Sequence, residues 1–212
     1  MVIHVVGEKL PLARHVLYVL RSRETSFPLF RRYMRLAGNI LAIEVSRDLE
    51  WVEEEVETPL NARIAEYRLA RPPLIVGILG ASIPLLEGFI DIYSDSPVGL
   101  FAARRKETEA GVEIEVFYTR LPKRIDDPVI LVDPMLATGL TMVKAIEEVN
   151  RRGARKVIIA SVIASKEGVE RVEGFYPEAS IYSLALDPML DHRFFIVPGL
   201  GDAGDRSLGV IP

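Results

Sequence analysis

The chain of 212 residues contains no cysteine, so disulfide bonds, thiolate catalysis and cysteine-ligated metals are excluded. Its three histidines, His4, His15 and His192, lack the spacing of metal ligands. No apolar run approaches the roughly 18 to 20 residues that a membrane span requires. The amino terminus also lacks the long apolar core of a signal peptide. We therefore expect a cytoplasmic protein that has no membrane partner.

An excess of positive charge is also absent. The formal net charge is −4, with 26 lysines and arginines against 30 acidic residues, and no basic-aromatic face is evident. This balance disfavours a nucleic-acid partner. The P-loop pattern G-x-x-x-x-G-K-[ST] and the dinucleotide pattern G-x-G-x-x-G are both missing. Any anion-binding site must therefore be local and of another type.

Hydrophobic residues make up 49% of the chain, which is enough for the core of one domain spanning residues 1–212. Short, continuous apolar runs, typical of strands buried on both faces, occur at residues 72–80, 129–133, 156–165 and 180–186. Helical patterns follow the first three, at residues 84–93, 141–154 and 166–177. This alternation predicts an α/β fold with a mostly parallel central sheet and helices on both faces.

Two regions lie outside this alternation. Residues 10–70 are expected to form N-terminal helices, because 10–22 and 27–48 have apolar residues at helical spacing and Thr58-Pro59 resembles a helix start. Residues 97–121 contain two strand-like segments around the polar "KETEAG", which predicts a projecting β-hairpin arm. The edges of such an arm need cover, so we expect self-association as a homodimer or homotetramer.

The stretch "VILVDPMLATGLTM" (129–142) combines a buried strand, one acid and a loop of small residues before a helix. Ligands of parallel α/β sheets bind beyond the carboxyl ends of the strands, and a helix N-terminus favours phosphate. Asp133 with Thr138, Gly139 and Thr141 is therefore suited to a ligand that has both a diol and a phosphate. An ordinary strand-to-helix turn explains the same residues equally well.

The same stretch resembles the phosphoribosyl-diphosphate motif of type I phosphoribosyltransferases. The single acid of "VDPMLATG" resembles the uracil phosphoribosyltransferases, where most of the superfamily has two adjacent acids. The tail "FFIVPGLGDAGDRSLG" (194–209) resembles the uracil-binding tail of that family, and "LRSRETSFPLFRR" near the N-terminus is similar to another of its motifs. The resemblance spans nearly the whole chain and is to an archaeal-type member.

The resemblance implies the type I phosphoribosyltransferase fold and the reaction of uracil with 5-phospho-α-D-ribose 1-diphosphate (PRPP) to give UMP and diphosphate. It implies catalytic roles for Asp133, Arg105 and Asp202. Uracil would be bound by Ile196, Gly201, Asp202 and Ala203. PRPP would be bound by Arg105, Asp133, Pro134, Met135, Leu136, Ala137, Thr138, Gly139, Leu140, Thr141 and Asp202. Mg²⁺ is the expected cofactor, held mainly by the substrate diphosphate.

Two arginines for the diphosphate are expected from the resemblance. Arg105 fits the spacing of the first, with Arg104 as an alternative. The second is missing, because Gly80 in "ILGAS" stands where the family normally has arginine. Losing a charged donor at a developing anion slows a reaction. The alternative to an active enzyme is therefore a catalytically weak or inactive nucleotide-sensing paralogue.

Two further functional assignments each have a purely structural alternative. The resemblance suggests GTP as a possible effector at Phe30, Arg31, Arg32, Tyr33 and Met34, although the two arginines are also consistent with a solvated helix face. In the tail, Asp205 and Arg206 are expected either to contact substrate or to form an internal salt bridge that shapes the loop.

Overall fold

The computed structural model describes residues 2–108 and 111–209, without the side chains of residue 2, residues 105–108 and residues 111–112. Eight strands of this described part form one sheet in the order β1-β10-β9-β7-β4-β5-β6, with β8 paired to β9. All pairs are parallel except β5 with β6. These strands are β1 (Val2–Val5), β4 (Leu74–Ile78), β5 (Val98–Thr108), β6 (Gly111–Arg120), β7 (Val129–Val132), β8 (Met135–Leu136), β9 (Val157–Ser165) and β10 (Ser180–Asp187).

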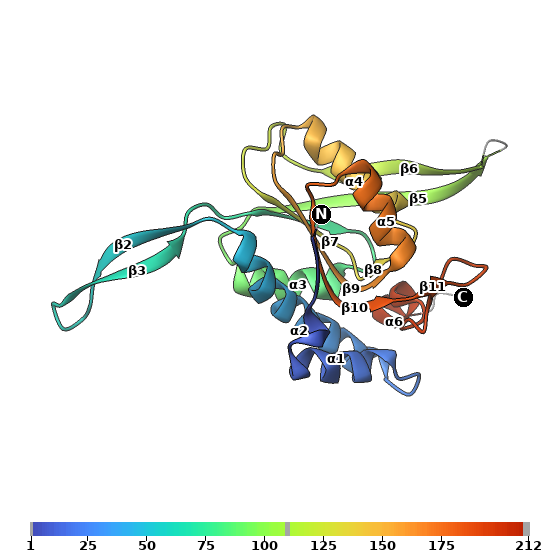
Figure 1. The fold of residues 1–212 in the computed structure, drawn as a ribbon, viewed down its shortest axis with the longest axis horizontal. Helices are drawn as coiled ribbons and strands as arrows, with labels where there is room; N and C mark the ends of the chain where they lie inside the picture. Colours follow the sequence, from blue (N-terminus) through green and yellow to red (C-terminus); the bar gives the residue numbers. More distant parts are fainter. Residues whose placement is uncertain (1, 109–110, 210–212) are drawn as a thin grey trace.

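Helices cover both faces of the sheet (Figure 1). One layer contains α1 (Pro11–Arg21), α2 (Phe27–Val45) and α3 (Ile83–Ile92), and the other contains α4 (Leu140–Arg151) and α5 (Lys166–Phe175). The central strands alternate between the two cores: Ile130 of β7 packs in the first and Leu131 in the second. The predicted α/β architecture, with its mostly parallel central sheet, is confirmed. No helix within the described residues is long and apolar enough to cross a membrane.

The remaining elements are short. The 3-10 helices η1 (Val6–Glu8) and η2 (Ser46–Asp48) follow β1 and α2. Near the carboxyl end of the chain, β11 (Met189–Leu190) pairs with β12 (Ile196–Val197), and α6 (Ala203–Leu208) follows. The C-terminal segment therefore forms a small hairpin and one helix beside the carboxyl end of β10.

The expected arm at 97–121 is confirmed as the antiparallel pair β5–β6, but the expectation of helices throughout 10–70 is wrong after residue 48. Residues 51–69 form a second hairpin, β2 (Trp51–Glu57) and β3 (Arg63–Leu69), which projects from the body (Figure 1). Thr58 caps the turn of this hairpin: its Oγ1 accepts from the N–H groups of Leu60 and Ala62. The same Thr-Pro pair thus begins a turn here, because Asn61 adopts a left-handed φ of 58° that ends any helix.

Close packing of α2 against α3 positions the loop that follows β4. A Cβ on Gly38 would lie 2.2 Å from the backbone oxygen of Leu85, and a Cβ on Gly88 would lie 2.2 Å from that of Arg35. Asn39 Nδ2 donates to Gly88 O at 2.9 Å, and the Tyr93 hydroxyl donates to Ala42 O at 2.7 Å. The helices can approach this closely only because neither glycine has a side chain.

We expect Gly38→Ala to lower the free energy of unfolding by about 1–3 kcal/mol, because the added methyl group meets backbone that cannot turn aside. Gly174→Ala in α5 is the matched control, since a Cβ at that position would have nothing within 4 Å of it. That control should raise stability by up to about 1 kcal/mol. Denaturant unfolding measures both, and equal effects of the two substitutions would contradict close packing at Gly38.

Candidate functional site

A cavity of about 410 Å³ lies at the carboxyl edge of the sheet, where the loops after β4 and β7 meet the C-terminal segment. It brings together residues far apart in the sequence. Its lining comprises Gly80, Ala81, Asp133, Pro134, Met135, Ala137, Arg193, Phe194, Phe195, Asp202, Ala203 and Gly204. The two motifs singled out in the sequence, around Asp133 and around Asp202, therefore border one cavity.

The loop after β7 is tied to β9. The Asp133 N–H donates to Ala160 O at 3.1 Å, and Pro134 O accepts from the N–H groups of Val162 and Ile163. β8 then pairs with the end of β9, where Ser165 Oγ donates to Ala137 O at 2.6 Å. Ser165 was not predicted as part of the site, and it fixes the loop from outside the cavity.

The loop enters α4 through Gly139, which adopts a left-handed φ of 77° as the N-cap residue. A Cβ there would lie 2.9 Å from Gly168 O, so only glycine fits between the loop and α5. Because glycine has no capping side chain, it leaves N–H groups of the first turn for an anion. Of the other predicted loop residues, Leu136 and Thr138 are buried, and Leu140 and Thr141 lie outside the cavity lining.

Asp133 follows β7 directly and keeps part of its surface open to the cavity. Burial of the carboxyl group raises its pKa to about 7, and the backbone N–H of Met135 opposes this shift only weakly. Both the protonated and the ionised form of Asp133 are therefore accessible near neutral pH, so the carboxyl can either donate to or accept from a ligand hydroxyl.

The C-terminal segment is anchored by a buried acid at the end of β10. Asp187 accepts two hydrogen bonds from Arg21 at 2.7 and 2.8 Å, and a third from the Gly199 N–H at 2.9 Å. Arg21 also donates to Gly199 O at 2.8 Å. Sequence reasoning missed this pair, because its partners are 166 residues apart and lie in segments with no shared pattern.

Arg206 holds the other end of the same loop. It donates to the carbonyl oxygens of Ser22 and Leu200, each at 2.6 Å, and to that of Leu20. Its guanidinium carbon lies 4.3 Å from the centre of the Phe30 ring. The loop is thus shaped by Arg206 and backbone carbonyls, and the expected Asp205–Arg206 salt bridge is not among the contacts of the described residues.

The predicted uracil-binding residues differ in how deeply they are buried. Ala203 is buried and lines the cavity beside Asp202, which caps α6 by accepting from the Asp205 N–H at 2.9 Å. Ile196 is buried in the core, and Gly201 is exposed outside the lining. Phe194 and Phe195, which were not singled out, lie on the cavity wall.

Of the three positions considered for the diphosphate, Gly80, Arg104 and Arg105, only Gly80 is among the described residues of the cavity lining. Gly80 lines it without any side chain, and a Cβ added there would approach only Leu208 Cδ1, at 3.3 Å. Arg104 is on the β5–β6 arm and pairs with Glu115 at 2.7 Å. The side chain of Arg105 lies outside the described residues. Among the described residues that line the cavity, the one cation is Arg193.

The residues suggested for GTP fall on two sides of α2. Phe30 and Met34 are fully buried in the core. Arg31 and Arg32 are exposed, and Arg31 donates to Ser207 O of α6 at 3.3 Å. Tyr33 is half-buried, with its hydroxyl 3.4 Å from His15 Nε2. Only three of the five side chains therefore reach a surface where a ligand could meet them.

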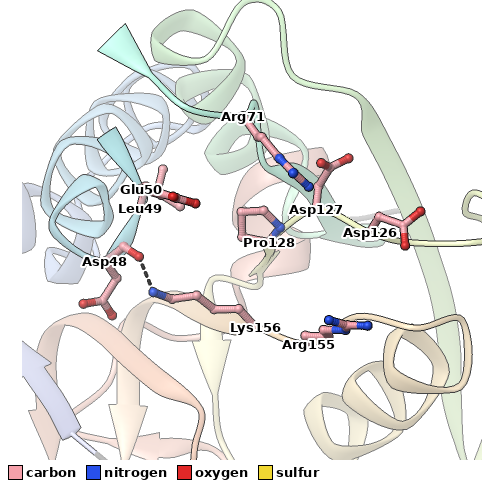
Figure 2. A pocket seen from close by; sticks show the side chains of 9 residues that line it. All are labelled: Asp48, Leu49, Glu50, Arg71, Asp126, Asp127, Pro128, Arg155 and Lys156. Atoms are coloured by element: carbon pink, nitrogen blue, oxygen red, sulfur yellow. Dashed lines mark hydrogen bonds between the residues drawn. The ribbon is translucent and has the colours of Figure 1, made fainter. Parts of the chain in front are cut away.

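A second hollow, of about 230 Å³, lies at the opposite, amino-terminal edge of the sheet (Figure 2). Its charges are mixed: Figure 2 shows Arg71 beside Asp127, and Lys156 donating to the backbone oxygen of Asp48. Four acidic and three basic residues line it, so neither sign of charge dominates. In the described part of the chain, no group of three or more metal-ligating side chains is found at this edge or elsewhere.

Comparison with known proteins gives one consistent result. A family model described as uracil phosphoribosyltransferase matches residues 7–209. The uracil phosphoribosyltransferase of Aeropyrum pernix is 54% identical and covers 99% of this chain and 98% of its own length. That of Pyrobaculum islandicum is 45% identical, with coverages of 92% and 94%. The solved structure of the AQ2163 protein from Aquifex aeolicus is 31% identical, with a TM-score of 0.89 over 99% of both chains.

The raised pKa of Asp133 predicts how stability changes with pH. The folded carboxyl binds more protons than the unfolded one, so stability falls as pH rises from about 4 to about 7. A pKa raised from 3.8 to about 7 costs about 4 kcal/mol of stability at pH 8. We expect Asp133→Asn to remove this cost and raise the melting temperature of the ligand-free protein at pH 8 by about 8–16 °C. Below pH 4 the gain should vanish. Asp95→Asn, at an exposed position, is the control. A gain that is independent of pH would contradict the assignment.

Proposed function

Because the chain belongs to the uracil phosphoribosyltransferase family, we propose that it converts uracil and PRPP to UMP and diphosphate. Its sheet and helix layers are those of the type I phosphoribosyltransferase fold. The observation that carries the proposal is the shared cavity: the Asp133 loop and the Asp202–Ala203 segment border it from distant parts of the sequence. A two-part substrate site needs this convergence.

In this proposal, the 5-phosphate binds at the N-terminus of α4 and the ribose hydroxyls bind Asp133. Uracil binds against Ala203 and the backbone of the C-terminal loop, whose N–H and C=O groups match the edge of the base. Cytosine would be rejected, since its 4-amino group would face a donor. The bond from uracil N1 to C1 of ribose forms while the C1–O bond to diphosphate breaks, and the N1 proton passes to solvent. Positioning and charge stabilisation then dominate catalysis.

We propose Mg²⁺ as the cofactor, held mainly by the diphosphate. The donor set fits this ion, because Mg²⁺ commonly takes one or two carboxylates together with substrate phosphates, and the cavity lining offers Asp133 and Asp202. When bound, the ion neutralises charge on the leaving diphosphate. The chain itself contributes the placement of the ribose and the base.

The alternative of a weak or inactive sensor rests on Gly80 alone. Nothing in the comparisons favours it, since relatives that cover nearly the whole chain are named as the enzyme. GTP remains a proposed effector, supported by two exposed arginines of α2: Arg31, which donates to Ser207 O of α6, and Arg32. A rate of UMP formation that stays flat across a GTP titration would remove it. The cytoplasmic location also stays a prediction.

We expect UMP to form when the protein is incubated with labelled uracil, PRPP and Mg²⁺. Ala203→Leu should raise KM for uracil about 5-fold to 150-fold, because overpacking a filled site costs about 1–3 kcal/mol, and it should change KM for PRPP little. Thermal unfolding checks that the variant folds. An equal rise in both KM values would contradict the placement of uracil at Ala203, and absence of UMP with the wild-type protein would contradict the proposed function.

A homodimer or homotetramer is also proposed, supported by apolar side chains on both arms. Tyr67 and Phe117 are 68% and 64% exposed, on the β2–β3 and β5–β6 hairpins respectively. Among the described side chains, the β2–β3 arm exposes five large apolar residues (Trp51, Val56, Leu60, Ile64 and Tyr67), whereas the β5–β6 arm exposes three (Val116, Phe117 and Tyr118). We therefore expect the β2–β3 arm to provide the interface. Tyr67→Glu should then lower the mass in analytical ultracentrifugation to that of a monomer, whereas the matched Phe117→Glu should not. The reverse result would assign the interface to the other arm.

A further inference from the structure

The cavity has an unusual charge balance for a site that holds phosphates. Its described lining contains two carboxylates, Asp133 and Asp202, and one cation, Arg193. PRPP contains a 5-phosphate and a diphosphate, both anionic, so its negative charges call for donors beyond the proposed Mg²⁺, and Arg193 is the one cationic side chain that the described lining offers. If the 5-phosphate takes the α4 loop, the diphosphate is left the turn of Gly80 and Ala81, which borders the same cavity just before α3.

A turn held by several hydrogen bonds places Arg193 at the cavity. The turn connects β11 to β12, and the carboxylate of Asp191 organises it. Asp191 Oδ1 accepts from the backbone N–H groups of Arg193 at 2.8 Å and Phe195 at 2.9 Å. The Asp191 N–H donates to Phe195 O at 2.8 Å, and the Phe194 N–H donates to Asp191 O at 2.9 Å. Phe194 is held at a φ of 64°, a conformation that non-glycine residues adopt only under such constraint.

The Arg193 side chain contacts Asp191 and Phe195, but its terminal Nη groups have no partner among the described residues. Its Nε lies 3.8 Å from Asp191 Oδ2, and its guanidinium carbon lies 5.2 Å from the centre of the Phe195 ring. The side chain remains 69% exposed. Within the described residues the two Nη groups donate no hydrogen bond, so they remain available to an incoming anion. A guanidinium fork is well matched to phosphate oxygens.

We propose that Arg193 contacts the diphosphate of PRPP and supplies, from the C-terminal segment, the side-chain charge that Gly80 lacks. The inference rests on the proposed function. It makes Arg193 a catalytic residue, because its charge stabilises the leaving group as the C1–O bond breaks and the electron pair departs with the diphosphate.

Arg193→Met tests the charge while keeping much of the length of the side chain. We expect KM for PRPP and the inhibition constant of inorganic diphosphate with Mg²⁺ each to rise about 10-fold or more, and kcat to fall by about 10-fold to 1000-fold. KM for uracil should change little. Arg193→Lys should lie between the wild-type and Arg193→Met values, because lysine retains the charge without the fork.

Arg124→Met is the matched control. Arg124 is another exposed arginine that pairs with an aspartate two residues away, Asp126, at 2.9 Å, but it is not part of the cavity lining. This variant should leave all the constants unchanged. Unchanged PRPP and diphosphate constants in Arg193→Met would overturn the proposal, as would a change confined to KM for uracil. If the wild-type protein formed no UMP, the proposed function would fail instead, so the two failures are distinguishable.

Gly80→Arg adds a second test. The first side-chain carbon of an arginine at this position would meet only the flexible end of Leu208. In the Arg193→Met background, we expect Gly80→Arg to restore diphosphate inhibition toward the wild-type value. In the wild-type background it should have a smaller effect, because the charge is already present. Equal effects in both backgrounds would show that the two positions act independently and would contradict the replacement of one charge by the other.

Discussion

The position of the C-terminal segment, and with it the cavity, depends on the partly buried ion pair of Asp187 with Arg21. Asp187 ends β10, is only 4% exposed, and receives three hydrogen bonds from α1 and the loop. Asp187 is buried whereas the Arg21 side chain is 25% exposed, so removing Arg21 would leave a buried carboxylate without its charged partner. The pair therefore joins the sheet, the first helix and the C-terminal loop into one unit. β11, β12 and α6 all extend from that junction, so the placement of the C-terminal segment follows from a contact outside the cavity.

The cavity lining has few charged side chains. Among the described residues, its carboxylates are those of Asp133, at the end of β7, and Asp202, which caps α6, and its cation is Arg193. We propose that N–H groups at the N-terminus of α4 bind the 5-phosphate. A net charge of −4 gives no general attraction for phosphate. Binding of an anionic substrate must then rely on short-range donors held in place beforehand. The hydrogen bonds of Ser165, Asp191 and Arg206 are consistent with this requirement, because they hold the loops around the cavity in position.

The sequence predicted the parts of the fold that depend on local pattern. Continuous apolar runs identified the central strands, and the acid after β7 located one wall of the cavity. The helix predicted to start at Thr58-Pro59 is wrong, because this pair occurs both at helix starts and in turns. The left-handed φ of Asn61 selects the turn. Arg193 was missed because a turn organised by Asp191 brings it to the cavity, and no periodicity reports such a turn. Leu136 and Ile196 match the family motif and are buried, and their binding roles stay predictions. The roles of the matching residues that line the cavity stay predictions.

The proton on Asp133 has a consequence for measurements of binding. With a pKa of about 7, the ligand-free carboxyl is partly protonated in ordinary buffers. A ligand whose hydroxyls donate to Asp133 favours the ionised form, and its binding releases a fraction of a proton. The buffer takes up that proton and adds its own heat of ionisation. Calorimetric enthalpies for the same ligand will therefore differ between phosphate and Tris, and the slope against buffer enthalpy counts the protons that leave the cavity.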